Sequence, residues 1–123
     1  MEITTNDISI NVISEGDSVP AGKTPILFLH GFTGSGKDWS FLFSSLDSKY
    51  FPIAIDLPGH GKSIGPNNTE HFSTEAHTDT VKNVLDYFNI SKVILVGYSL
   101  GGRTALSFTI QNKAQVLGLV LES

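Results

Sequence analysis

The chain has 123 residues, which is enough for one domain with a buried core. Its 12 acidic and 8 basic residues give a formal net charge of -4 without a Lys/Arg cluster, which argues against binding to nucleic acids or anionic membranes. The lack of cysteine excludes disulfides, thiolate catalysis and cysteine zinc sites. The N-terminus has no signal-peptide pattern and no apolar run is long enough to span a membrane, so we expect a soluble, cytoplasmic protein.

The first half of the chain predicts strands, loops and one short helix. Alternating apolar and polar residues over 1–15 predict a hairpin of two opening edge strands with its turn at Asn6-Asp7. Continuous apolar runs at 26–29 and 51–55 predict buried strands, and a short helix carrying residues 39–46 lies between them.

The second half alternates helix and strand. Ser73 is suited to cap an amphipathic helix, and Asn89 suits its left-handed C-terminal end. An apolar strand starting at Val93, a helix over 100–111 and a last apolar strand over 116–121 follow. Strands separated by helices predict an α/β domain with a mostly parallel sheet and crossover helices.

The apolar strand from Val93 ends in Gly97-Tyr98-Ser99-Leu100-Gly101, the G-x-S-x-G pattern of a nucleophile elbow. In such an elbow a strand turns sharply into a helix, the serine has a strained backbone, and side chains at the glycines would collide. The alternative is that Ser99 only caps the following helix.

A nucleotide-binding alternative rests on the run GFTGSGKD at 31–38, which comes within one residue of a phosphate loop. Asp56 after an apolar strand and Asn112-Lys113 add partial support. The pattern lacks the two residues that would bind the nucleotide's metal and base. Asp38 stands in place of the hydroxyl residue that would bind Mg²⁺, and Gln115 stands in place of the carboxylate that would recognise the base.

A nucleophilic serine needs N–H donors for the negative charge that develops on the substrate oxygen. In this architecture one donor is the residue after the serine, here Leu100, and the other comes from the loop after an earlier strand. We expect the second donor to be the N–H of Phe32, because Gly31 lets the backbone turn toward Ser99.

Three motifs in order, FLHGF at 28–32, DLPGHGKS at 56–63 and GYSLGG at 97–102, resemble the N-terminal half of the α/β-hydrolase fold. With Arg103 added, they resemble most the 2-succinyl-6-hydroxy-2,4-cyclohexadiene-1-carboxylate synthases of menaquinone biosynthesis. That resemblance implies a catalytic serine that promotes proton abstraction and elimination of pyruvate from an enolpyruvyl substrate, with no cofactor. A serine esterase and a non-catalytic anion-binding module are the alternatives, and a P-loop NTPase is a remote one.

Arg103 lies four residues after Ser99, near the positive end of its helix, where the helix dipole disfavours a cation. An anionic ligand or an ion pair with a loop acid such as Asp56 would explain it, and the resemblance favours a substrate carboxylate. Tyr98 and His30 are expected at the same pocket, although His30 is also explained as a loop-organising residue.

The histidine that would activate Ser99 is missing from the expected position. All four histidines precede Ser99, and the only acid after it is Glu122, whereas this fold orders its triad Ser, acid, His. His60 is explained as loop-organising, and His71 and His77 as surface residues without metal-ligand spacing.

We therefore expect residues 1–123 to be the N-terminal part of one domain, cut after about the sixth strand, without the lid and the C-terminal acid and histidine segments. Such a piece would be inactive by itself, and an open strand edge would favour oligomers.

Overall fold

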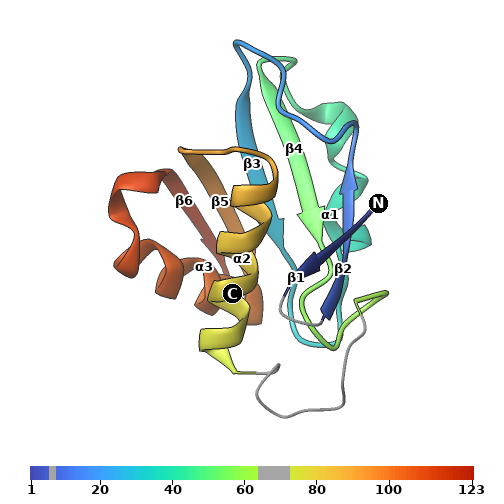
Figure 1. Ribbon diagram of the computed structural model, residues 1–123, viewed down its shortest axis with the longest axis vertical. Helices are drawn as coiled ribbons and strands as arrows, with labels where there is room; N and C mark the ends of the chain where they lie inside the picture. Colours follow the sequence, from blue (N-terminus) through green and yellow to red (C-terminus); the bar gives the residue numbers. More distant parts are fainter. Residues whose placement is uncertain (6–7, 64–72) are drawn as a thin grey trace.

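The apolar runs and helical stripes form a six-stranded sheet with helices on both faces, described for residues 1–5, 8–63 and 73–123 of a computed structural model (Figure 1). The strands are β1 (Glu2–Thr5), β2 (Ile8–Ser14), β3 (Thr24–Leu29), β4 (Tyr50–Ile55), β5 (Val93–Tyr98) and β6 (Val116–Glu122). The helices are α1 (Lys37–Ser40), α2 (Thr74–Tyr87) and α3 (Leu100–Gln111), with 3₁₀ helices at Phe43–Ser45 and Lys113–Gln115.

The strand order is β1-β2-β4-β3-β5-β6. The pairs β4–β3, β3–β5 and β5–β6 are parallel, whereas β1–β2 and β2–β4 are antiparallel. The predicted mostly parallel sheet with crossover helices is confirmed. The prediction that both opening strands are edge strands was wrong for β2, because β2 pairs with β4 as well as with β1. The predicted turn at Asn6-Asp7 lies outside the described residues.

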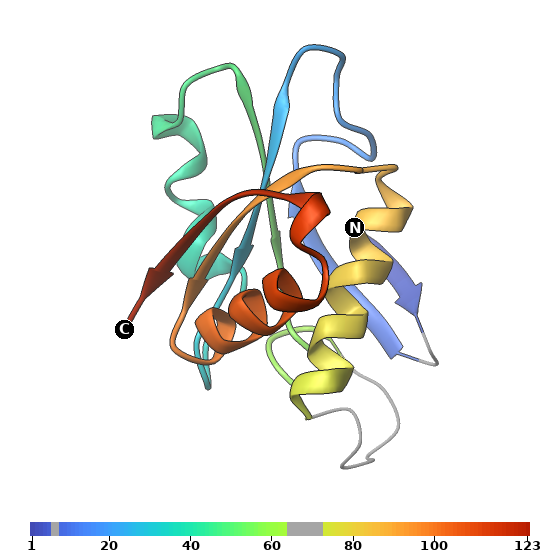
Figure 2. The same cartoon turned by 90° about the vertical axis from the view of Figure 1, so that its left-hand side faces the viewer.

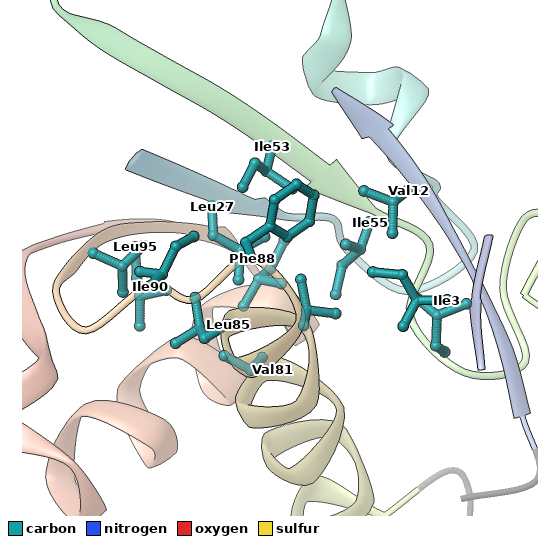
Figure 3. Close-up of a cluster of buried hydrophobic side chains, with 14 of the residues drawn as sticks. Ile3, Val12, Leu27, Ile53, Ile55, Val81, Leu85, Phe88, Ile90 and Leu95 are labelled. Atoms are coloured by element: carbon teal, nitrogen blue, oxygen red, sulfur yellow. The ribbon is translucent and has the colours of Figure 1, made fainter. Parts of the chain in front are cut away.

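Side chains of the central strands alternate between the two faces of the sheet, as the pleat requires. Leu27 of β3 and Leu95 of β5 belong to the main core beneath α2 and α3 (Figure 3). Phe28 of β3 points to the other face and packs against Trp39 and Phe43. Figure 2 shows α1 on one side of the sheet and α2 and α3 on the other. The short helix predicted to carry residues 39–46 is instead two segments, α1 and the 3₁₀ helix at Phe43–Ser45.

Local signals set the ends of α2. The Ser73 hydroxyl accepts a hydrogen bond from the N–H of Ala76 at 3.0 Å, which confirms the predicted cap. Asn89, just past the helix, has φ 55°, the predicted left-handed conformation. None of the helices in the described ranges is long and apolar enough to cross a membrane.

Parallel pairing aligns the carboxyl ends of four strands. Leu29 pairs with Ile55 on one side and with Gly97 on the other, and Gly97 pairs with Leu121. The segments that follow β3, β4, β5 and β6 therefore meet at one edge of the sheet, where parallel α/β sheets bind ligands.

The outer edge of this sheet exposes apolar residues. In the described part of the chain β6 pairs only with β5, and Leu117, Val120 and Leu121 of β6 and Leu106 and Ile110 of α3 are exposed. An open edge with apolar side chains favours association with another chain.

We expect residues 1–123, expressed alone, to self-associate through this edge in sedimentation velocity. Val120→Lys should shift the distribution toward monomer, because a lysine on the edge opposes strand pairing. Tyr87→Lys, which changes an exposed aromatic residue on α2, is the matched control and should leave the distribution unchanged. A monodisperse monomer for the unmodified chain would contradict the expectation.

Candidate active site

Ser99 lies at a strained turn between β5 and α3. Its backbone has φ 51° and ψ -108°, a conformation that non-glycine residues rarely adopt. Its side chain makes no capping hydrogen bond to α3, so the simple helix-cap alternative does not describe it. The backbone strain predicted for a nucleophile elbow is confirmed.

The glycines on either side of Ser99 are required by close contacts. A Cβ at Gly97 would lie 2.7 Å from Cα of Gly102, and a Cβ at Gly101 would lie 2.6 Å from the carbonyl oxygen of His30. Both distances are too short for non-bonded atoms, so strand and helix can approach this closely only through glycine.

Hydrogen bonds hold the Ser99 backbone from two sides. Its N–H donates to the carbonyl of Glu122 in β6 at 2.9 Å, and its carbonyl accepts the N–H of Arg103 at 3.0 Å. Ser99 and Arg103 line one hollow of about 380 Å³, together with Leu106, Leu121 and other neighbours. The structure thus brings together the predicted nucleophile and the predicted anion-binding cation.

Arg103 is exposed and, among the described residues, forms no ion pair or side-chain hydrogen bond. The alternative of an ion pair with Asp56 is wrong. The Asp56 carboxylate is only 2% exposed and accepts the N–H groups of Gly36 and Lys62, each at 2.7 Å, and Nδ2 of Asn11 at 3.1 Å. The guanidinium is therefore available to an external anion.

The loop after β3 lies against the elbow. A Cβ at Gly31 would lie 2.7 Å from the ring of Tyr98, so only glycine permits this approach. Within the described part of the chain, neither the N–H of Phe32 nor that of Leu100 has a hydrogen-bond acceptor. Two free N–H groups on adjoining segments are what a developing oxyanion needs.

Tyr98 borders a second hollow of about 300 Å³, together with Gly31, Asp38, Trp39 and Glu122. Glu122 also borders the hollow of Ser99 and Arg103, so the two hollows are neighbours. The sequence had suggested one pocket for Tyr98 and Arg103, and the structure shows two adjoining ones.

His30 is fully buried, lines neither of these hollows, and is hydrogen-bonded to the main chain through both ring nitrogens. Its Nδ1–H donates to the carbonyl of Gly31 at 2.7 Å, and its Nε2 accepts the N–H of Leu57 at 2.9 Å. Burial lowers the pKa of His30, which keeps the ring neutral with this pattern of one donor and one acceptor. The geometry favours the loop-organising interpretation over contact with substrate.

His77 is 1% exposed, so the prediction of a surface position was wrong. The signal was present: His77 precedes Val81 by one helical turn and continues the buried stripe of α2. Its ring nitrogens form no well-shaped hydrogen bond, and burial lowers its pKa to about 4, with His60 and His30 lowering it further and the nearby Pro58 carbonyl opposing the shift. His71 lies outside the described residues.

Three histidines far apart in sequence form a cluster of tilted and edge-on rings that sequence reasoning missed. The ring centroid of His60 lies 5.0 Å from that of His30, 6.4 Å from that of His77 and 5.9 Å from that of Phe32. In the described ranges no group of three or more His, Asp and Glu side chains is arranged to hold a metal.

Two N–H groups of the loop from Gly31 to Lys37 donate to the protein's own carboxylates. The N–H of Ser35 donates to Asp38 at 3.2 Å and that of Gly36 to the buried Asp56 at 2.7 Å. A phosphate loop needs these groups free for its ligand and a long helix behind them, whereas α1 has 4 residues. This geometry removes the basis for the nucleotide-binding alternative.

Known proteins resemble this chain over nearly its whole length. The alpha/beta hydrolase fold family matches residues 24–123. A Bacillus subtilis (strain 168) protein provisionally named as 2-succinyl-6-hydroxy-2,4-cyclohexadiene-1-carboxylate synthase is 39% identical, over 100% of this chain and 44% of that protein. The Enterobacter sp. (strain 638) protein of that name is 37% identical, over 79% of this chain and 36% of its own length.

Solved structures show the same fold. MGS-M2, an alpha/beta hydrolase enzyme from a Medee basin deep-sea metagenome library, has a TM-score of 0.88 at 20% identity, over 98% of this chain and 43% of its own. Est816, described as an N-acyl homoserine lactone degrading enzyme, has a TM-score of 0.83 at 29% identity, over 98% of this chain and 44% of its own. The chain spans less than half the length of these relatives.

Gly101→Ala should lower the free energy of unfolding by about 3 kcal/mol, because its Cβ would overlap the backbone at the end of β3. Gly102→Ala in the same helical turn is the control: its Cβ would come no closer than 3.3 Å to another residue, and alanine favours helix by about 1 kcal/mol. We expect its unfolding free energy to stay within about 1 kcal/mol of the unmodified protein. Urea denaturation measures both, and equal losses would contradict the close-contact argument.

The neutral His77 should make stability depend on pH. Its pKa of about 4 in the fold lies below the ordinary 6.5, so its contribution is complete above pH 6.5 and is lost as the pH falls toward 4. The loss is on the order of 3 kcal/mol. His77→Leu should reduce this pH dependence, whereas Lys82→Leu on the exposed side of α2 should retain it. Denaturant unfolding across this range measures the difference, and identical pH profiles for all three proteins would refute it.

Proposed function

We propose that this chain, which belongs to the α/β-hydrolase fold family, carries the serine-bearing half of an enzyme. The enzyme would act like the 2-succinyl-6-hydroxy-2,4-cyclohexadiene-1-carboxylate synthases. In this proposal Ser99 is the catalytic residue, and the N–H groups of Phe32 and Leu100 form the oxyanion hole. Arg103 and Tyr98 bind a small anionic substrate. Identity to relatives that carry this name supports the proposal.

The observation that carries the proposal is the shared hollow of Ser99 and Arg103. A serine needed only for ester hydrolysis gains nothing from an unpaired guanidinium beside it. A substrate carboxylate gains a charge-assisted hydrogen bond from that guanidinium, which also fixes the reacting carbon relative to the serine.

The chemistry follows from these positions. Ser99 gives its hydroxyl proton to a partner base and takes up a proton from a substrate carbon. The electron pair of that C–H bond forms a new C=C bond, and the carbon–oxygen bond to the enolpyruvyl group breaks. The enolpyruvate released becomes pyruvate by taking up a proton at carbon. The electron pair of the broken carbon–oxygen bond stays on the enolpyruvate oxygen, and the two N–H donors stabilise the negative charge that develops there.

The partner base is proposed to lie beyond residues 1–123 of a longer protein, since none of His30, His60 and His77 lines the hollow of Ser99. The greater length of the relatives supports this assignment. By this reasoning the 123-residue chain has little activity alone, and the cytoplasmic location and the lack of a cofactor stay predictions from the sequence.

A serine hydrolase is the second candidate, favoured by the 29% identity to Est816 over 98% of this chain. The two functions differ in what they require of Arg103. Hydrolysis of a neutral ester needs Ser99 and the two N–H donors but no cation.

In the full-length protein, Ser99→Ala should abolish pyruvate release from the enolpyruvyl cyclohexene carboxylate, with kcat falling by about 10³-fold or more. Arg103→Ala should lower kcat/KM for that substrate by about 10- to 100-fold, the value of a charge-assisted hydrogen bond. Steady-state assays of pyruvate and of an aryl ester measure both activities.

Lys82→Ala removes an exposed cation from α2 and should leave both activities unchanged. Ester hydrolysis that needs Ser99, survives Arg103→Ala and comes without pyruvate release would overturn the synthase proposal in favour of the serine hydrolase.

A further inference from the structure

The loop that carries the Phe32 N–H is a strained turn. The N–H of Gly34 donates to the carbonyl of Gly31 at 2.9 Å, which closes a turn with Phe32 and Thr33 at its corners. Thr33 has φ 65°, which is costly for a β-branched residue. Such a conformation persists only where neighbouring groups hold it.

Phe32 itself is poorly covered. Its side chain is 74% exposed and its N–H has no acceptor among the described residues. In the described part of the chain its one ring contact is with His60, at 5.9 Å between centroids and 77° between planes. This is an edge-to-face pair, a geometry that is favourable and directional.

His60 is well fixed and so can hold another group. The Nδ1–H of its ring donates to the carbonyl of Pro58 at 3.1 Å. Its backbone N–H donates to the carbonyl of Leu57 at 2.9 Å, and its backbone carbonyl accepts the N–H of Ser63 at 2.9 Å. Its ring also lies against those of the buried His30 and His77.

We infer that His60 is a positioning residue for the oxyanion hole: its ring holds Phe32, and thereby the Phe32 N–H, in the orientation that meets the substrate oxygen. This inference rests on the proposed function, which assigns that N–H its role. His60 does not touch the reacting atoms and acts only through Phe32.

A misplaced oxyanion donor stabilises the transition state less well but changes the binding of the substrate little, so we expect the effect in kcat rather than in KM. Removal of a complete donor costs about 10²- to 10³-fold in kcat. Loosening one of two donors should cost less, about 10-fold.

The test is a double-mutant cycle in the full-length protein. His60→Ala should lower kcat about 10-fold with KM within about twofold, and His60→Phe, which keeps a ring against Phe32, should restore kcat to within about threefold. Phe32→Ala should lower kcat similarly. His60→Ala in the Phe32→Ala background should then cost less than about twofold, because the contact is already gone.

A drop in kcat that is additive in the double variant, or that His60→Phe does not restore, would overturn the inference. If the unmodified protein turns over neither substrate, the proposed function fails, and NMR order parameters of the Phe32 amide decide the inference separately. They should fall in His60→Ala and not in His60→Phe, and an unchanged value in both would overturn it.

Discussion

The close approach of α3 to the end of β3 is the constraint on which the site depends. At Gly101 the helix comes so near the carbonyls of Leu29 and His30 that no side chain fits between them. This contact brings the turn at Ser99 to the loop after β3, although the two are far apart in sequence. A larger residue at position 101 would move Ser99 away from the Phe32 N–H without altering either group.

The backbone N–H groups at this edge of the sheet are divided between internal and external partners. The buried carboxylate of Asp56 takes those of Gly36 and Lys62, which ties the loops after β3 and β4 together. The N–H groups of Phe32 and Leu100 are left without a partner in the described chain. An internal anion therefore organises the loops, and the free donors are held by a frame that does not need a ligand to form.

Local patterns predicted the elbow, the Ser73 cap and the bounds of α3, since each depends on residues a few positions apart. The position of β2 inside the sheet could not be predicted, because sequence order does not say which strands pair. The burial of His77 could have been predicted by extending the stripe of α2 one turn back. The edge-on contact of His77 with His60 could not, because packing between separate elements creates it.

The bond from the N–H of Ser99 to the carbonyl of Glu122 has a consequence for how the protein is made. A nascent chain that has emerged only as far as α3 lacks one of the two hydrogen bonds that hold the Ser99 backbone. The strained turn is completed only after β6 has left the ribosome and joined the sheet. The Ser99 turn is therefore held from both sides only once β6 has paired with β5.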